Sequence, residues 1–215
     1  MSGAARREPP LSAAGFAASF PVSRETLARL AAYVALLERW SARINLVGRA
    51  TLADPWRRHI LDSAQLRPFV PAAARSLVDL GSGAGFPGLV VAILGQQGVE
   101  LVEADSRKCA FLTEAARITG ARVEVRQTRI EALARRPFDV VTARALAPLD
   151  RLLGLARPFL GADSLCLFLK GEQTEAELTV ARQGWTMTAT SSPSRSDPRG
   201  VVLQLRQVAR APHCG

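Results

Sequence analysis

The chain has 215 residues, of which 48% are hydrophobic, and a formal net charge of +9. This length fits one α/β domain with a small extension. No apolar run approaches the roughly 20 residues that a membrane-spanning helix needs, so we expect no membrane partner. Three widely spaced cysteines and two histidines suggest neither a disulfide framework nor a metal centre. We therefore expect no metal, a reducing cytoplasmic setting, and core positions for Cys109 and Cys166.

The basic charge is carried almost wholly by arginine. Lysine occurs only at positions 108 and 170, so 26 of the 28 basic side chains are arginine. The planar guanidinium matches phosphate and stacks on bases. The excess of positive charge therefore predicts a polyanionic partner such as a nucleic acid.

Residues 1–22 combine Ala, Ser and Pro with Arg6 and Arg7. The segment lacks the apolar stretch and cleavage site of a secretory signal, and it is only mildly similar to a mitochondrial transit peptide. Its composition is typical of a disordered tail.

A helical preface is predicted over residues 23–70. Ser23 can cap a helix that runs to about Ile44, because apolar side chains recur there at spacings of three and four. Asp54 followed by Pro55 predicts the start of a second helix. Between residues 24 and 67, eight arginines stand against four acids, so the preface should present a basic surface.

Strands and helices then alternate through a core at residues 76–208. The predicted strands are 76–80, 99–103, 121–125, 138–142, 164–169, 185–190 and 201–208. The predicted helices between them are 89–94, 108–118, 130–134, 149–160 and 172–182. This alternation predicts an α/β fold with a mostly parallel sheet, helices on both faces and an antiparallel hairpin at the end.

Residues 77–88, Leu-Val-Asp-Leu-Gly-Ser-Gly-Ala-Gly-Phe-Pro-Gly, are the most informative segment. An apolar strand carrying an acid breaks into glycines and leads into a helix, as in the first crossover of a nucleotide-binding domain. Glycine accepts positive φ and lets a ligand approach the backbone. We therefore take Asp79, Gly81, Gly83 and Gly85 as candidate cofactor-binding residues.

Two cofactor classes fit this loop. The last three glycines match the dinucleotide fingerprint, whereas the first three, with Asp79 two residues earlier, match the S-adenosylmethionine pattern. A carboxylate would repel a pyrophosphate but suits a sulfonium and an ammonium group. Glu103, at the end of the next strand, can accept ribose hydroxyls from either cofactor. S-adenosylmethionine is favoured over a nicotinamide cofactor and over a glycine turn without a ligand, since the closing hairpin is usual in Rossmann-like methyltransferases.

Further motifs follow one another along residues 25–208. They are Trp40 with Asn45-Leu46, Arg58-His-Ile-Leu-Asp-Ser63, the Gly-Phe-Pro-Gly ending at Gly88, Glu103-Ala-Asp-Ser-Arg-Lys108, Arg129-Ile-Glu131, Ala143-Arg-Ala145 and Leu169-Lys-Gly171. On these motifs the chain resembles the ribosomal RNA small subunit methyltransferase G family, also called glucose-inhibited division protein B.

The resemblance implies methylation of guanine N7 in 16S rRNA, with S-adenosylmethionine as cofactor and 16S rRNA or the small ribosomal subunit as partner. It makes residues 23–210 a single methyltransferase domain, and we expect a monomer. Carried over by matching motifs, the cofactor-lining residues would be Gly81, Phe86, Glu103, Ala104, Asp105, Ile130, Glu131 and Arg144. Arg58 and His59 would form an RNA-side or cofactor-lid group, or else a solvated helix face with an Arg58–Asp62 pair.

Guanine N7 carries a free lone pair, so its methylation needs alignment and desolvation but no general base. The chain accordingly reads Thr142-Ala-Arg-Ala145 where amino-group methyltransferases carry an Asn/Asp-Pro-Pro-aromatic box. It also lacks the cysteine pair of cytosine C5 methylation. Arg144, at the carboxyl edge of its strand, is the candidate catalytic residue and should touch cofactor and guanine; the alternative is a surface salt bridge.

Two further basic residues are candidates for RNA binding. Lys170 ends a strand beside the site and can neutralise a phosphate, and Arg199, in the loop at 191–200, can contact the RNA backbone. A structural lysine and a mobile charged loop are the alternatives. Rival functions are methylation of another RNA or a small molecule, nicotinamide-dependent oxidoreduction, and RNA binding without catalysis. The net charge disfavours a small-molecule acceptor, and the intact cofactor loop disfavours a binding module.

Overall fold

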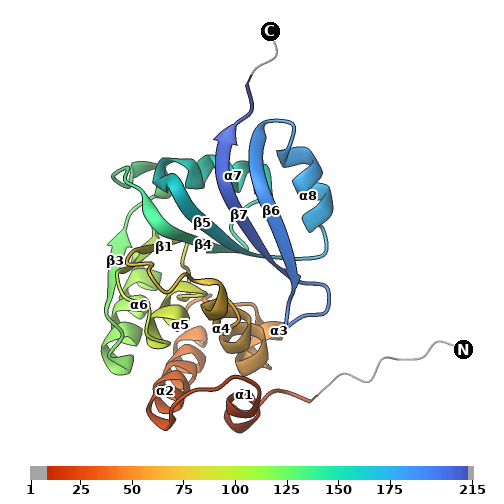
Figure 1. Cartoon of the computed structure of the whole chain (residues 1–215). Helices are drawn as coiled ribbons and strands as arrows, with labels where there is room; N and C mark the ends of the chain where they lie inside the picture. Colours follow the sequence, from red (N-terminus) through yellow and green to blue (C-terminus); the bar gives the residue numbers. More distant parts are fainter. Residues whose placement is uncertain (1–8, 213–215) are drawn as a thin grey trace, which may run out of the picture.

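The computed structural model describes residues 9–212, which form a seven-stranded sheet with helices packed on both faces (Figure 1). The strand order is β3-β2-β1-β4-β5-β7-β6. The first five strands of this order are parallel, whereas β7 is antiparallel to β5 and to β6. The strands are β1 (Leu77–Leu80), β2 (Val99–Glu103), β3 (Val123–Gln127), β4 (Phe138–Arg144), β5 (Leu160–Lys170), β6 (Trp185–Pro193) and β7 (Val201–Arg210).

The helices divide between the two faces of the sheet, with α2, α5 and α6 on one face and α7 and α8 on the other (Figure 1). The α-helices are α1 (Ala13–Ser19), α2 (Arg24–Ser41), α3 (Arg49–Leu52), α4 (Asp62–Ala64), α5 (Gly88–Ile93), α6 (Ser106–Thr119), α7 (Leu149–Ala156) and α8 (Thr174–Ala181). A π-helix covers Trp56–Leu61, and 3₁₀ turns cover Arg67–Phe69, Ile130–Ala132 and Arg157–Phe159.

The core consists of two layers separated by the sheet. Successive residues of β1 alternate between them: Leu77 packs against α2, α5 and α6, and Val78 packs against α7 and α8. All four residues of β1 are buried, as expected for a central parallel strand covered on both faces. Because the chain leaves β1 for β2 on one side and β4 lies on the other, the strand order reverses there and opens a crevice at the carboxyl ends.

The helical preface is part of the same core. Tyr33 of α2 is fully buried, and its hydroxyl donates a hydrogen bond to the Ala84 carbonyl of the glycine loop. Its ring packs against Phe86 at 5.3 Å and Phe111 at 6.2 Å between centroids. Burial raises the pKa of Tyr33 well above its usual value, so the phenol stays protonated and keeps this hydrogen bond.

The structure confirms the mostly parallel sheet, the antiparallel hairpin and the alternation of strands and helices. Ser23 caps α2 as predicted, accepting from the Thr26 amide at 3.0 Å. Some boundaries differ: β3 lies two residues further along than predicted, and α7 ends at Ala156, where Arg157–Phe159 tightens into a 3₁₀ turn. Cys109 and Cys166 are buried as predicted, whereas Cys214 and His213 lie outside the described residues.

The prediction of a disordered tail through residue 22 is wrong for residues 13–19, which form α1. Ser12 caps this helix by accepting from the Gly15 amide at 3.0 Å. Phe16 is fully buried, and its ring stacks on Phe20 at 5.6 Å. Two phenylalanines four residues apart after a serine cap are the signal that composition alone obscured. Residues 1–8 lie outside the described part of the chain.

The second predicted helix begins where expected but has an unexpected form. Asp54 accepts from the Arg57 amide at 3.3 Å, as an N-cap should. After Pro55, the six residues Trp56–Leu61 form a π-helix, and α4 follows directly from Asp62. The wider π turn does not follow the 3.6-residue period used to read the sequence. π-Helical turns are rare in proteins, and those that occur often lie at functional sites. This one carries Arg58 and His59.

Candidate active site

A cavity of about 500 Å³ opens at the carboxyl ends of β1, β4 and β5. The glycine loop forms one wall, and the π-helix with residues 46–51 forms another. The loop between β6 and β7, residues 194–200, closes a third side. The predicted residues that line the cavity are Arg58, His59, Gly81, Gly83, Phe86, Arg144 and Lys170. We call this space the acceptor cavity.

The glycine loop has the backbone conformation that the sequence predicts. Gly81, Gly83 and Gly85 have φ of 66°, 56° and 92°, values that other residues rarely adopt. A Cβ added at Gly83 would meet only the Gly81 carbonyl oxygen at 3.9 Å, so this glycine faces open space. A Cβ at Gly85 would lie 2.8 Å from the Tyr33 hydroxyl. Gly83 therefore leaves room for a ligand, whereas Gly85 lets the preface pack closely.

Glu103 ties the end of β2 to the glycine loop. One carboxylate oxygen accepts from the Gly83 amide at 2.9 Å, and the other accepts from the Asp105 amide at 2.8 Å. Asp105 in turn caps α6 by accepting from the amides of Arg107 and Lys108, and these hydrogen bonds lower its pKa. The carboxylate of Glu103 thus lies directly beside the loop that leaves room for a ligand.

The other predicted cofactor-lining residues lie at the same edge of the sheet, beyond the acceptor cavity. Ala104 joins β2 to the cap of α6, and the Ile130–Ala132 turn, with Glu131 at its centre, follows β3. The Thr128 amide donates to the Glu103 carbonyl at 3.0 Å, which holds the start of this turn against the end of β2.

Asp79 is a buried carboxylate at the base of the glycine loop. Its Oδ1 accepts from the Thr142 hydroxyl at 2.7 Å, while its Oδ2 has no hydrogen-bond partner among residues 9–212. Burial raises the pKa of Asp79 to about 6, and the hydrogen bonds from Thr142 and the Gly88 amide act against that rise. At neutral pH the carboxylate is a buried anion with one oxygen unpaired within the described residues, and such an anion favours a positive charge nearby.

Arg144, at the end of β4, holds its guanidinium at the centre of the acceptor cavity. Nη1 donates to the Arg58 carbonyl at 3.0 Å and to Asp62 Oδ2 at 3.1 Å, and Nη2 contacts His59 Nδ1 at 3.2 Å. The guanidinium also lies 4.8 Å from the centre of the Phe86 ring. These contacts use three of the five N–H groups of the guanidinium. The other two have no partner within the described chain.

His59 is a neutral member of this cluster. Its ring stacks on Phe86 at 4.8 Å with an interplanar angle of 17°. Burial and the charges of Arg144 and Arg58 lower its pKa to about 3. Because arginine can only donate, Nδ1 must accept from Arg144 and the imidazole proton resides on Nε2. That nitrogen is buried without a partner among residues 9–212.

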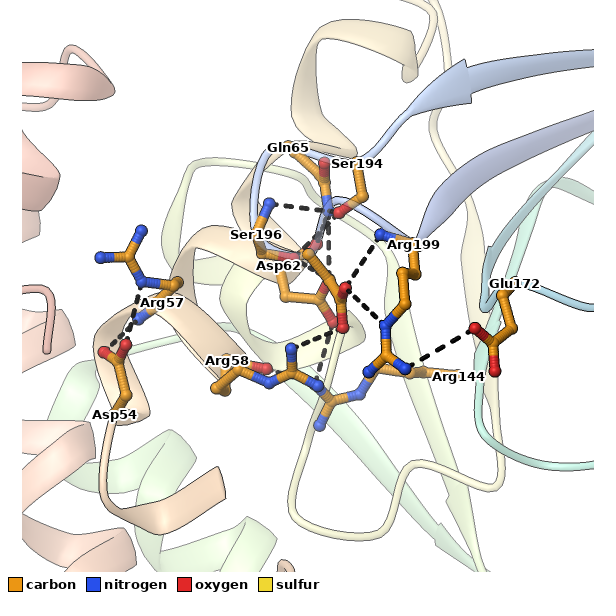
Figure 2. A network of polar contacts seen from close by, with 11 residues as sticks. Asp54, Arg57, Arg58, Asp62, Gln65, Arg144, Glu172, Ser194, Ser196 and Arg199 are labelled. Carbon is orange, nitrogen blue, oxygen red and sulfur yellow. Dashed lines mark hydrogen bonds and ion pairs between the residues drawn. The ribbon is translucent and has the colours of Figure 1, made fainter. Parts of the chain in front are cut away.

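Asp62 connects Arg144 to the loop between β6 and β7, as Figure 2 shows. Its Oδ1 accepts from the Ser196 hydroxyl at 2.5 Å and from Gln65 Nε2 at 3.1 Å. The alternative of an Arg58–Asp62 pair on a solvated helix face is wrong. Arg58 instead pairs with Asp197 at 2.7 Å, and Asp62 pairs with Arg144.

The two remaining basic candidates differ in their surroundings. Lys170 pairs with Glu177 at 2.5 Å and donates to the Ala147 carbonyl at 3.1 Å, which leaves its side chain only 10% exposed. Arg199 is 71% exposed and approaches Glu172 at 3.6 Å and Asp197 at 3.9 Å (Figure 2). Arg199 is thus open to a partner, whereas Lys170 is engaged within the fold.

Several residues of the site carry no sequence signal that predicts their role. They are Gln65, Ser194, Ser196 and Asp197, which join residues 58–65 to residues 194–200. Serine, proline and arginine between two strands favour a mobile loop, and only the pairing with a distant helix shows otherwise.

Within residues 9–212, no helix is long and apolar enough to span a membrane. The same residues hold no group of three potential metal ligands.

Comparisons with known proteins give one consistent result. Residues 26–197 match the family model described as GidB, rRNA small subunit methyltransferase G. A protein named ribosomal RNA small subunit methyltransferase G from Rhodospirillum rubrum is 59% identical over 196 residues, covering 91% of this chain and 98% of its own. The protein of the same name from Paramagnetospirillum magneticum is 60% identical over 189 residues, covering 88% and 92%.

Solved structures share the fold at low sequence identity. Magnesium protoporphyrin IX methyltransferase from Synechocystis, solved with bound S-adenosylmethionine, gives a TM-score of 0.57 at 14% identity, covering 87% of this chain and 99% of its own. A ribosomal protein L11 methylase from Lactobacillus delbrueckii gives 0.55 at 18% identity, covering 70% and 79%. These similarities show that the sheet and its helices have the arrangement of S-adenosylmethionine-dependent methyltransferases.

Proposed function

Since the chain belongs to the rRNA small subunit methyltransferase G family, we propose that its acceptor cavity is where N7 of one guanine in 16S rRNA is methylated. The chain is an S-adenosylmethionine-dependent methyltransferase of small-subunit rRNA. The observation that carries the assignment of the site is the Arg144 guanidinium. It lies beside the glycine loop with two N–H groups unpartnered among residues 9–212.

The residues around the glycine loop fit S-adenosylmethionine. Gly83 leaves open space against its backbone, where a side chain would obstruct a ligand. Asp79 supplies a buried negative charge with one oxygen unpartnered in the described chain, which suits a cationic ligand. Glu103 would hold the ribose hydroxyls through a carboxylate that is already aimed at the loop. Ala104, Asp105, Ile130 and Glu131 would border the adenine from the ends of β2 and β3.

Methylation of guanine N7 requires no general acid or base from the protein. S-adenosylmethionine, when bound, supplies a methyl group on a positively charged sulfur. Guanine N7 attacks with its own lone pair, so no side chain has to remove a proton. Alignment of the reactants and exclusion of water then account for the acceleration. Alignment alone can lower the activation barrier by about 7–11 kcal/mol. His59 has a pKa lowered to about 3, and its Nδ1 already accepts from Arg144, so it is a poor proton acceptor, in agreement with a site that holds no general base.

Arg144 would recognise the guanine and leave N7 free. An arginine N–H can donate to guanine O6, which lies next to N7 on the same edge of the base. Asp62 balances the guanidinium charge at 3.1 Å, which limits repulsion between Arg144 and a cationic cofactor. The Phe86 ring supports the flat side of the guanidinium. Arg144 is therefore the side chain we assign to both the cofactor and the guanine.

RNA would approach from the side of the π-helix and the loop between β6 and β7. Arg199 is more exposed than Arg58, Lys170 and His59, and Arg58, which lines the acceptor cavity, is 39% exposed. His59 would contribute as an uncharged ring. Lys170 would act on phosphate only if it left Glu177.

The decisive experiment is methyl transfer from labelled S-adenosylmethionine to small ribosomal subunits that lack this modification, with mass spectrometry of the product nucleosides. We expect labelled 7-methylguanosine from one position of 16S rRNA. Binding of the cofactor without incorporation of label would overturn the proposed acceptor and point to another RNA or a small molecule. Naked 16S rRNA, tested in parallel, would show whether the free RNA or the assembled subunit is the substrate.

We also propose that one chain is the active unit and that it works in the cytoplasm, where ribosomal subunits are assembled. Residues 23–210 would act as one methyltransferase domain, since Tyr33 of the preface bonds the glycine loop. Light scattering on the purified protein, with and without RNA, tests the monomer directly.

A further inference from the structure

The loop between β6 and β7, residues 194–200, contacts both residues that hold Nη1 of Arg144, Arg58 and Asp62. Nη1 donates to the Arg58 carbonyl and to the Asp62 carboxylate. The loop pairs with the side chain of Arg58 through Asp197 at 2.7 Å. It contacts Asp62 through the Ser196 hydroxyl at 2.5 Å. Apart from Arg144 itself, no other segment of the described chain supplies side-chain contacts to both of these residues.

Gln65 makes a second connection between the loop and Asp62. Its Nε2 donates to Asp62 Oδ1 at 3.1 Å and to the Ser194 hydroxyl at 3.1 Å. Its Oε1 accepts from the Arg195 amide at 2.7 Å. The side chain is almost fully buried, as is Ser196. A buried amide with every partner in place fixes one arrangement of loop and helix, because a different arrangement would leave polar atoms unpaired.

The loop is also anchored away from the cavity. Arg195 donates to the Ser19 carbonyl at 2.6 Å, and its guanidinium lies 5.9 Å from the Phe20 ring. Within the loop, the Ser194 amide donates to the Gly200 carbonyl at 2.9 Å, and the Gly200 amide donates to the Asp197 carbonyl at 2.9 Å. The segment therefore has a defined shape of its own when it meets the π-helix.

We propose that residues 194–200 position Arg144 for methyl transfer, with Ser196 acting through Asp62 as the principal positioning residue. This inference rests on the proposed function, since it assigns Arg144 to the guanine. Asp62 holds Nη1 in one direction only while its own carboxylate is fixed, and Ser196 supplies the shortest hydrogen bond to it. Without that bond, Asp62 can turn about its side-chain torsions and the guanidinium can follow.

The test compares Ser196→Ala, Ser196→Thr and Ser191→Ala in the full chain. Ser191 is an exposed residue of β6, so its alanine variant controls for the loss of a hydroxyl from the same hairpin. We expect Ser196→Ala to lower kcat for guanine methylation about tenfold, as for loss of a hydrogen bond to a charged group. Cofactor affinity and the melting temperature should change little. Ser196→Thr, which keeps the hydroxyl, should recover most of the rate, and Ser191→Ala should equal the wild type.

A double variant separates positioning from general support of the fold. If Ser196 acts through the guanidinium, adding Ser196→Ala to Arg144→Lys should lower kcat by less than twofold beyond Arg144→Lys alone, because contacting residues are non-additive. Independent, additive losses would overturn the proposal, as would an unchanged kcat in Ser196→Ala. A wild-type protein that binds cofactor but forms no 7-methylguanosine would instead overturn the proposed function, so the two failures are distinguishable.

Discussion

The cofactor half and the acceptor half of the site are built by different means. In the cofactor half, Glu103 accepts from the backbone amides of Gly83 and Asp105, which lie 20 and 2 residues away in the chain. In the acceptor half, Asp62 joins the side chains of Arg144 and Ser196, which lie 82 and 134 residues away. One half is therefore a cradle of backbone groups, and the other is a charge network assembled only by the complete fold.

This difference predicts how each half responds to substitution. A cradle of backbone groups is sensitive to backbone spacing and indifferent to most distant side chains. A charge network can lose its geometry when one side chain is shortened, even though the sheet is intact. Four substitutions test this contrast, beginning with the largest expected effect.

Removal of the guanidinium should abolish most activity in the acceptor half. We expect Arg144→Ala to lower the rate of methyl transfer about 1000-fold, within the range seen when a preorganised donor is removed from an active site. The fold should persist by circular dichroism. Arg151→Ala, at an exposed position of α7, is the matched control and should keep full activity. Undiminished transfer by Arg144→Ala would remove this residue from the site.

A methyl group at Gly88 should damage the cofactor half through the backbone alone. A Cβ there would lie 2.6 Å from the Cβ of Asp79 and 2.6 Å from Leu101 Cδ2, so α5 would have to move away from β1. We expect Gly88→Ala to cost about 3 kcal/mol in the free energy of unfolding.

Gly154→Ala is the matched control for Gly88→Ala, because nothing lies within 4 Å of a Cβ added there in α7. Alanine should stabilise that helix by about 0.5–1 kcal/mol. Urea denaturation of both variants measures the difference. Equal stabilities would contradict the close packing of α5 on β1.

Loss of charge at Glu103 should weaken cofactor binding more than it weakens the hydrogen bond to the glycine loop. Glutamine can still accept one backbone amide but no longer offers a carboxylate to a ribose. We expect Glu103→Gln to raise the Kd for S-adenosylmethionine about tenfold to 30-fold, consistent with about 1.5–2 kcal/mol for a charge-assisted hydrogen bond. Calorimetric titration with the cofactor tests this, with Glu124→Gln on exposed β3 as control. Unchanged affinity would place the ribose elsewhere.

Neutralisation of Asp79 should raise the free energy of unfolding and weaken cofactor binding. Its pKa is raised from 3.8 to about 6 by burial, so the folded state is penalised as the group ionises between about pH 4 and 6. The shift sets an upper bound of about 3 kcal/mol. Asparagine avoids that cost but weakens the bond from Thr142, so we expect Asp79→Asn to gain about 1 kcal/mol at pH 8.

The pH dependence of this gain provides its own control. Below about pH 4 the wild-type carboxyl is protonated in both states, so the advantage of Asp79→Asn should disappear there. Above pH 6 the advantage should be constant. Denaturation curves at pH 4 and pH 8 test the sign. Cofactor affinity should fall in the variant at pH 8, where the wild-type carboxylate is charged, and much less at pH 4, where it is protonated in the folded state. A larger gain at pH 4 than at pH 8 would contradict an ionised buried Asp79.

The succession of strands and helices along the chain and the glycine loop could be predicted from the sequence because their signals are local. The continuous apolar residues of β1, the acid within it and the three glycines all lie within 77–88. The preferred cofactor followed from Asp79, since the sign of a charge is readable without coordinates. The positions of Glu103 and Arg144 at the carboxyl ends of their strands followed from the parallel sheet.

The arrangement of the acceptor half could not be predicted in the same way. Nothing in the sequence around Ser196 or Asp197 indicates that Asp62 and Arg58 are their partners, because hydrogen bonds between distant segments leave no period. The π-helix itself is invisible to a search for 3.6-residue spacing. The sequence left an Arg58–Asp62 pair one turn apart as an alternative, whereas Asp62 pairs with Arg144 at the end of β4 and Arg58 pairs with Asp197.

The hydrogen bond from Tyr33 to Ala84 has a consequence for how such enzymes can change during evolution. Helix α2 of the preface is fastened, on its buried side, to the loop expected to carry the cofactor. The preface therefore cannot be exchanged between relatives as an independent specificity module. A graft that brought a new preface without its tyrosine would leave a buried carbonyl unpaired. New RNA targets should arise through changes in the exposed side chains of the π-helix and of residues 194–200, with the buried surface of α2 retained.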